Sequence, residues 1–112
     1  MRIWDVDPAR LCRKHLLGEH REIHALFVIL SDNRPGYRNH PETKRWVGKL
    51  PALAARHDRV VNEMIRRGYN HHSPLPESPG SSTQNEFLAT VEEQEEMLGA
   101  KDCDCLLSRR CA

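Results

Sequence analysis

The fold is decided by a stretch between residues 8 and 31, which reads PARLCRKHLLGEHREIHALFVILS. Asp7 stands directly before it as a suitable helix N-cap, and Pro8 takes the first helical position, where its missing N–H does no harm. From Ala9 to about Leu30 the apolar residues recur at helical spacing. The stretch therefore predicts one long amphipathic helix.

Two more helices are predicted in the middle of the chain. A short one starts near Pro41 and ends around residues 48–50. Pro51 suits the first turn of a longer helix that runs to Arg67, and Gly68 suits the left-handed position that ends it.

The last third of the chain predicts a fourth helix. After an irregular connection, Thr83 and Glu86 have the spacing of a capping box, and apolar residues continue to Leu98. With no strand signal and no repeat, we predict an all-α fold, a compact single-domain bundle of three to four helices. Residues 1–75 form its core. Residues 76–112 add a connection, an acidic helix and a cysteine-containing tail packed on or trailing the same domain.

The composition fits one small helical domain with an aliphatic core. Of the 112 residues, 38% are hydrophobic and only 5% aromatic, so Trp4 and Trp46 are expected to be buried rather than to stack on bases. No apolar run approaches the roughly 20 residues that cross a bilayer, and the acidic start is no signal peptide. We expect a monomer that stays in the cytoplasm and binds no membrane.

The positive charge gathers in the first part of the chain. Residues 1–70 hold 14 Lys and Arg against 8 Asp and Glu, a net charge of +6. Residues 71–112 hold 3 against 8, a net charge of −5. A basic region suits nucleic acid, because each phosphate contact releases condensed counterions. The imbalance also fits a solvated surface without a ligand, so charge alone leaves both interpretations open.

Polar residues interrupt the apolar face of the first helix. At 100° per residue, that face comprises Cys12, Leu16, Ile23, Leu26, Phe27 and Leu30. Glu19 falls inside it, and His15 and Glu22 project near its edge. The next stripe outward is basic and consists of Arg10, Lys14 and Arg21. A carboxylate at the edge of a core is unfavourable unless it is paired or lines a cleft.

Two interpretations account for these polar residues. One is an internal ion-pair network, in which arginines of the third helix hold Glu19 or Glu22. The other is a cleft that binds phosphates on its basic lip and carries proton or carbocation chemistry at its floor. The third helix also turns Arg56 and His57 inward, although a lone histidine there is more typical of a hydrogen-bonded core residue. Inward polar groups on two helices favour the cleft.

Two motifs resemble a known family. Residues 15–22 read HLLGEHRE, similar to the H-L-x-x-E-Y-R-E signature of the pyrimidine-dimer DNA glycosylase/abasic-site lyase (endonuclease V) family. Residues 64–70 read MIRRGYN, which resembles that family's C-L-K-R-G-F-N, and residues 1–3 parallel its T-R-I. The resemblance covers roughly residues 1–75.

The resemblance implies a DNA-repair enzyme that acts on damaged double-stranded DNA. In the family, the α-amine of the first residue attacks C1′ of the damaged nucleotide, the base leaves, an imine forms and β-elimination cuts the strand. Met1 takes the nucleophile's position, and Glu22 matches the catalytic glutamate. Arg2, His15 and Arg21 match residues that grip the DNA. The family flips out a nucleotide and needs no metal or organic cofactor, so neither is expected here.

The residue pattern adds four further DNA-binding candidates, which are Arg10, Lys14, Arg56 and His57. The nucleophile is chemically reasonable as well. An α-amine has a reference pKa near 7.7–8.0 against about 10.4 for lysine, so roughly a tenth of it is neutral at pH 7. Nearby cations are expected to favour this neutral, reactive form.

The chain departs from the family pattern in three places. The family exposes a small first residue by removing Met, whereas the bulky Arg2 is expected to keep Met1 in place. His20 stands where the signature has Tyr, and Lys14 where it has Gln. The family's aromatic, basic C-terminal tail is replaced by an acidic helix and cysteines, which leaves the lesion preference open.

The cysteines and paired histidines give weaker signals. Cys103, Cys105 and Cys111 offer three thiols, one short of the usual four-ligand zinc or iron–sulfur site. Cys12, His71 or His72 could supply the fourth, but no spacing places them nearby. We expect reduced thiols and a surface position for the paired histidines.

Two rival functions belong to other classes. A non-catalytic DNA-binding or protein-interaction bundle predicts DNA binding without strand cleavage. A His/Cys metal-binding module predicts tightly bound metal and little salt-dependent affinity for DNA.

Overall fold

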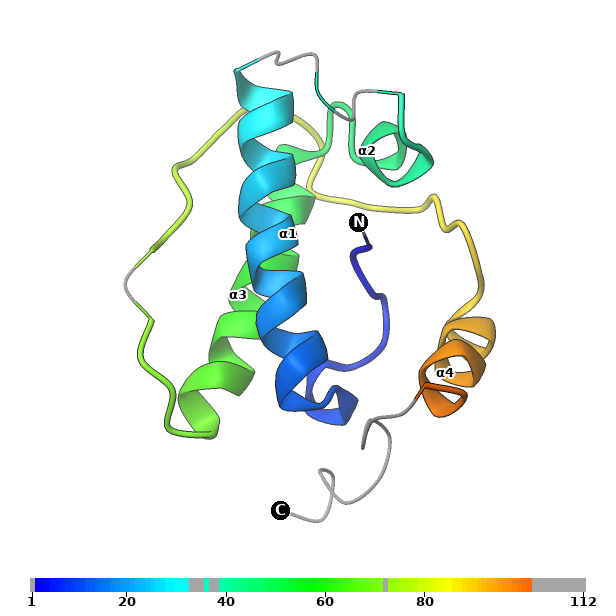
Figure 1. Cartoon of the computed structure of the whole chain (residues 1–112). Helices are drawn as coiled ribbons and strands as arrows, with labels where there is room; N and C mark the ends of the chain where they lie inside the picture. The colour runs from blue at the N-terminus through cyan, green and yellow to red at the C-terminus, as the bar shows by residue number, and fades with distance from the viewer. Residues whose placement is uncertain (1, 33–35, 37–38, 72, 102–112) are drawn as a thin grey trace.

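A computed structural model of the chain describes residues 2–32, 36, 39–71 and 73–101 (Figure 1). These residues form helices and irregular segments, with no strand in the ranges described. The short 3-10 helix η1 precedes four α-helices; the elements are η1 at Pro8–Arg10, α1 at Arg13–Ser31, α2 at Pro41–Arg45, α3 at Leu50–Arg66 and α4 at Val91–Gly99. The predicted all-α, compact single domain is confirmed.

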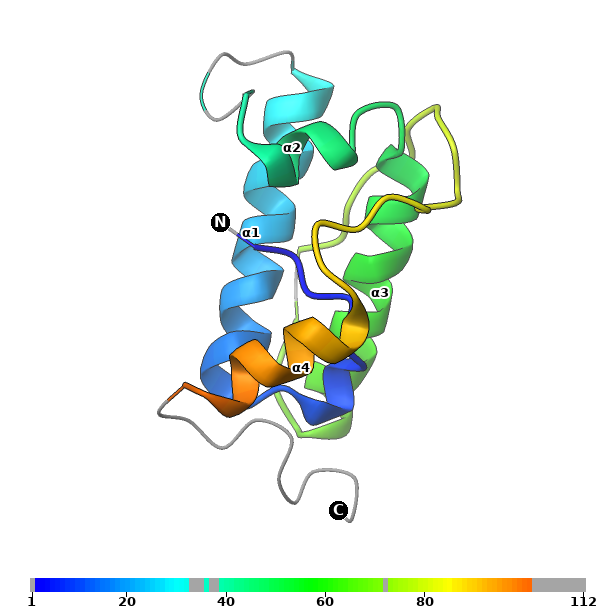
Figure 2. The ribbon, with the colours of Figure 1, turned by 90° about the vertical axis from the view of Figure 1, so that its right-hand side faces the viewer.

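The core lies between α1 and α3, which pack against each other; α3 lies behind α1 in Figure 1 and beside it in Figure 2. The two helices contribute fully buried aliphatic side chains, among them Leu16, Ile23, Leu26, Leu53 and Val60. Trp4 and Trp46 belong to the same cluster, as the composition predicted. Leu98 of α4, only 1% exposed, joins them and ties the last helix to the core.

The predicted first helix is wrong at its beginning. Asp7 does cap a helix, because its Oδ1 accepts the N–H of Ala9 at 3.0 Å, but that helix is the three-residue η1. Leu11 and Cys12 then adopt extended backbone, with ψ values of 140° and 168°. Both side chains are buried, so burial overrides the helical pattern at this point. The α-helix starts afresh at Arg13 with Cys12 as its N-cap.

The end of α3 follows the prediction. Gly68 has φ of +85°, the left-handed conformation that glycine adopts without a steric penalty. The N–H of Tyr69 donates to the carbonyl of Met64 at 2.9 Å, which turns the chain back over the last turn. The side chain of Arg67 reaches η1 and donates to the carbonyl of Leu11 at 2.7 Å.

The capping box predicted at Thr83 is wrong, because the real one lies seven residues later. The Oγ1 of Thr90 accepts the N–H of Glu93, and the Glu93 carboxylate accepts the N–H of Thr90. Upstream, the side-chain amide of Gln84 donates to the Arg45 carbonyl at 2.6 Å. The polar residues of this segment therefore fasten an irregular chain to α2 and cap no helix.

No helix in the described part of the chain has the length and apolar character needed to span a bilayer.

Candidate active site

The polar edge of α1 borders a hollow with a volume of about 580 Å³. Residues from three parts of the chain line it: the N-terminal segment, α1 and the region around the end of α4. Five of the predicted site residues are among them: Arg2, Lys14, His15, Arg21 and Glu22. The structure thus brings together a carboxylate, a histidine and three of the predicted cations around one opening.

Glu22 is the open carboxylate of this hollow. Its side chain is half-buried and forms no ion pair with any residue that the structure describes. Glu19, which also lines the hollow, is 2% exposed and is held by the guanidinium of Arg56. Nε of Arg56 donates to Oε2 of Glu19 at 2.6 Å, and one terminal nitrogen donates to Oε1 at 3.0 Å. The ion-pair interpretation therefore applies to Glu19 and the cleft interpretation to Glu22.

The electrostatics of the two carboxylates differ accordingly. Burial raises the pKa of Glu19, and the charge and hydrogen bonds of Arg56 act against that rise. With both Glu19 oxygens bound to Arg56, this carboxylate is a structural partner rather than a free base. Glu22 keeps its oxygens available to whatever occupies the hollow.

His15 is held in place by its neighbours. Its Nδ1 lies 3.0 Å from Sγ of Cys12, and its ring meets the ring of Trp4 edge-on with centroids 6.1 Å apart. Burial lowers the pKa of His15, and the charges of Lys101 and Lys14 lower it further. A neutral imidazole at neutral pH leaves the hollow's positive charge to Lys and Arg and serves as a hydrogen-bonding group.

The N-terminal segment runs alongside α1 (Figure 1). Two buried polar side chains, those of Arg45 and Gln94, hold it in place. Arg45 of α2 donates to the Ile3 carbonyl at 2.8 Å and pairs with Asp5 at 3.2 Å. Gln94 of α4 accepts the N–H of Asp5 at 2.7 Å. These contacts fix the backbone just after Arg2, whose guanidinium lies 5.1 Å from the centre of the Trp4 ring.

Arg45, which holds the N-terminal segment, is buried, and the carboxylate of Glu42 compensates its charge. Nε of Arg45 donates to Oε1 of Glu42 at 2.6 Å, and the indole N–H of Trp46 donates to the same oxygen at 3.0 Å. Sequence reasoning missed these roles, because nothing in the pattern marks Glu42, Arg45 or Gln94 as buried. Their partners are up to 89 residues away in the sequence.

Residues 1–77 match the model of a protein family described as pyrimidine dimer DNA glycosylase. The matched segment is more than half of the 112-residue chain. The chain belongs to the pyrimidine dimer DNA glycosylase family. None of the curated proteins compared with the chain matches it, and neither does any solved structure.

Family membership implies a DNA glycosylase whose substrate is DNA, and the hollow carries the charges that suit a polyanion. Its lining extends beyond the matched segment, because Met97 and Lys101 also contribute. Sequence reasoning did not find these two residues. Their position depends on how α4 docks, which no local pattern encodes.

Three predicted DNA contacts do not line this hollow. Arg10 forms an ion pair with Glu95 of α4. Arg56 is occupied by Glu19, and His57 is 1% exposed on the side of α3 that faces other histidines. Burial and existing partners leave these three side chains poorly available to phosphate groups.

Met1, the predicted nucleophile, lies outside the described residues, as do His72, Cys103, Cys105 and Cys111. Arg2, to which Met1 is covalently joined, lines the hollow.

Proposed function

We propose that this chain acts on duplex DNA with pyrimidine dimers or abasic sites, breaking a glycosidic bond at a dimer as a DNA glycosylase and cutting the abasic site as a lyase, with the α-amine of Met1 as nucleophile. The observation that carries the proposal is the hollow itself. It combines the unpaired carboxylate of Glu22 with Arg2, the residue directly after the amine.

The covalent step exchanges one bond at the sugar for another. The neutral amine attacks C1′ while the bond from C1′ to the base breaks. The base takes the bonding electrons and a proton, and in a dimer it stays joined to the neighbouring pyrimidine. The amine nitrogen gives up a proton. Opening of the sugar ring gives an imine between the amine nitrogen and C1′. Loss of a proton from C2′ then expels the 3′ phosphate, and water releases the enzyme.

Glu22 is suited to the charge that develops in this sequence. The sugar acquires positive character as the base departs, and the imine is cationic when protonated. A carboxylate held in a half-buried hollow stabilises both states and is also positioned to carry protons between the sugar and water. The proposal gives these roles to Glu22 and a structural role to Glu19, as the partner of Arg56.

The cations around the opening are suited to bind the phosphate backbone of the DNA substrate. Arg2, Lys14 and Arg21 from the matched segment and Lys101 from beyond it bring four positive charges to one rim. Phosphates on either side of a flipped nucleotide would bind to such a rim, with affinity that falls as salt rises. His15 adds a neutral hydrogen-bonding group.

Borohydride trapping tests the nucleophile directly. Sodium borohydride reduces an imine to a stable amine, so the chain should become covalently attached to duplex DNA that contains a dimer or an abasic site. Undamaged duplex should give no adduct. Mass spectrometry of the trapped peptide should locate the DNA on the first residue.

A matched pair of proteins provides the control. An N-terminal extension that blocks the amine should abolish trapping, and its removal to regenerate free Met1 should restore it. Strong trapping by the blocked protein would assign the chemistry to another amine. DNA binding with no adduct from the unblocked protein would favour a non-catalytic DNA-binding bundle.

A further inference from the structure

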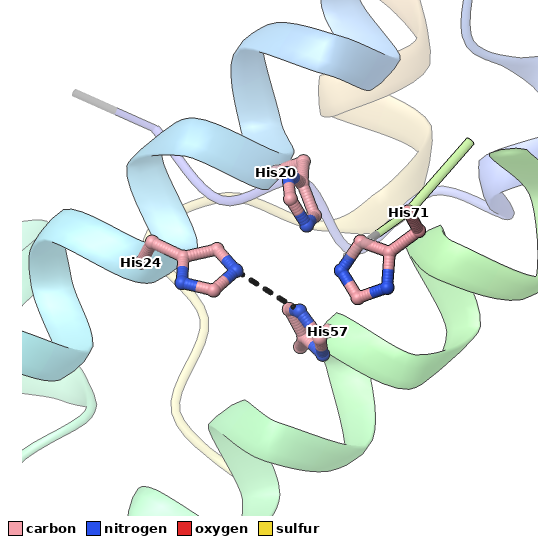
Figure 3. A group of neighbouring side chains, drawn as sticks. All are labelled: His20, His24, His57 and His71. Carbon is pink, nitrogen blue, oxygen red and sulfur yellow. Dashed lines mark hydrogen bonds between the residues drawn. The ribbon is translucent and has the colours of Figure 1, made fainter. Parts of the chain in front are cut away.

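Four histidines gather on the side of α1 that faces away from the hollow. His20 and His24 lie one turn apart on α1, His57 lies on α3, and His71 follows Gly68 after the end of α3 (Figure 3). One ring nitrogen from each lies within 4.8 Å of the others. Five of the six ring pairs have centroids 4.7 to 5.2 Å apart.

The nitrogen atoms at the centre of this cluster lack ordinary partners. Nε2 of His24 and Nε2 of His57 face each other at 3.1 Å. Nε2 of His20 and Nε2 of His71 are buried without any hydrogen-bond partner. A buried polar nitrogen without a partner is unfavourable, and two in one cluster of four imidazoles point to a missing ligand.

Imidazole nitrogens are a suitable donor set for such a ligand. The four histidine side chains are buried or half-buried. A neutral imidazole offers one lone pair, and this is the form that binds transition metals.

We propose that His20, His24, His57 and His71 bind a single Zn²⁺ ion through four imidazole nitrogens. Four ligands complete the tetrahedral coordination of a structural zinc site. Zinc–nitrogen bonds of about 2.0–2.1 Å put ligand nitrogens about 3.3 Å apart, close to the 3.1 Å between His24 and His57. The other nitrogens reach that spacing by small side-chain rotations.

The groups behind the histidines suit a metal site. Oδ1 of Asp58 lies 3.1 Å from Nδ1 of His57, the carboxylate–histidine arrangement that orients a metal ligand. This contact holds the ring of His57 through Nδ1 and leaves its Nε2 directed toward Nε2 of His24.

The geometry gives this ion a structural role. His20 and His24 are each two positions from Glu22, which on an α-helix is a rotation of about 200°. The ion would therefore lie on the opposite side of α1 from the hollow, where it joins α1, α3 and the segment after Gly68. The proposal differs from the sequence-based expectation that no metal is needed, and it does not depend on the proposed catalytic mechanism.

Metal analysis should use the full chain with Cys103, Cys105 and Cys111 replaced by serine, because thiols could bind zinc on their own. We expect about one Zn²⁺ per chain with a Kd below about 1 µM, measured by titration against a chromogenic chelator. Zinc should also raise Tm, since it binds only the folded state. Less than stoichiometric binding by this folded protein would overturn the proposal.

Variants should identify the ligands. His71→Gln and His24→Gln remove side chains that are only half-buried, and each should weaken zinc binding by about 100-fold or more. His40→Asn is the matched control, because it removes a histidine while keeping an N-cap acceptor on α2. Circular dichroism should confirm that each variant is folded.

Cobalt provides a readout of the ligand type as well as of binding. Co²⁺ in four-nitrogen tetrahedral coordination gives strong visible absorption without the near-ultraviolet charge-transfer band that thiolate ligands produce. We expect the visible bands in the serine-substituted chain and in His40→Asn, and their loss in His71→Gln. Zinc binding that persists in both histidine variants, or that disappears only with the cysteines, would reject the assignment.

Discussion

Polar residues lie in different environments on the two sides of α1. On one side, Glu22 and His15 border an open hollow ringed by cations. On the other side, His20 and His24 are packed against His57 and His71, and two of the four rings lack a hydrogen-bond partner for Nε2. Glu19 belongs to a third environment between them, where a buried guanidinium binds both of its oxygens.

The difference concerns which buried polar groups find a partner inside the fold. Burial alone does not decide it, because Glu19 and the Nε2 atoms of His20 and His71 are all buried, yet only Glu19 has a partner. Our proposals assign an outside partner to Glu22 and to the histidine cluster, the substrate in one case and an ion in the other.

The largest effect is expected from breaking the Glu19–Arg56 pair. Glu19→Gln removes the charge that compensates a buried guanidinium, and we expect the free energy of unfolding to fall by about 3–5 kcal/mol. Urea denaturation at pH 7 measures this loss. Glu96→Gln, at an exposed position on α4, should change stability by less than about 0.5 kcal/mol. A loss for Glu19→Gln no larger than this control would mean that Glu19 is not the structural carboxylate.

The second prediction concerns Glu22, whose replacement should affect activity and not stability. Glu22→Gln should leave the urea midpoint nearly unchanged, because Glu22 pairs with no described residue. Single-turnover incision of dimer-containing duplex should slow by about 100-fold or more, since a carboxylate that acts on developing charge is lost. Affinity for the damaged duplex should remain. Normal incision by this variant would remove Glu22 from the mechanism.

A third prediction addresses the cationic rim. Lys14→Ala and Arg21→Ala should each weaken binding to damaged duplex by about 1 kcal/mol and reduce the slope of log K against log salt by about 1. Arg59→Ala, an exposed arginine of α3 that does not line the hollow, is the matched control. Equal slopes for all three variants would show that the rim does not face phosphate.

The smallest effect concerns Glu63, a buried carboxylate whose partner Arg66 is partly exposed to water. The guanidinium of Arg66, together with that of Arg67, lowers the pKa of Glu63 below its usual value. A carboxylate whose pKa is lowered by folding stabilises the folded state at pH values above its unfolded-state pKa of about 4.3. This contribution disappears as the pH falls through the folded-state pKa.

Glu63→Gln should therefore lower the free energy of unfolding by about 1 kcal/mol at pH 7. The difference from the unsubstituted protein should shrink below about pH 4, when Glu63 becomes protonated. Urea titrations at a series of pH values measure it, and a difference that is constant with pH would contradict the ion-pair explanation.

The parts of the fold that were predictable depend on local chemistry. The apolar period of α1, the left-handed Gly68 and the proline at the start of α3 are properties of neighbouring residues, and all three are found. The errors arose where long-range contacts override local preference. Leu11 and Cys12 leave the helix because they are buried, and Gln84 bonds to α2 where a cap was expected.

The candidate site was likewise predictable only in part. Helical periodicity put His15 and Glu22 at the edge of the apolar face and Arg10, Lys14 and Arg21 on the adjacent stripe. All of these except Arg10 line the hollow. The clamp on the N-terminal segment could not be predicted. It joins Arg45 to Ile3 across 42 positions, and a buried arginine has no sequence signature that separates it from an exposed one.

The sequence by itself determined the helical class, the family and most of the polar residues of α1 that border the hollow, because spacing and motif are readable along one segment. Only the tertiary structure decided that Glu19 is paired while Glu22 stays open, and that four histidines meet behind α1. The physical reason is distance along the chain. Arg56 reaches Glu19 across 37 positions and His57 reaches His24 across 33, so each polar group obtains its partner only when α1 and α3 pack together.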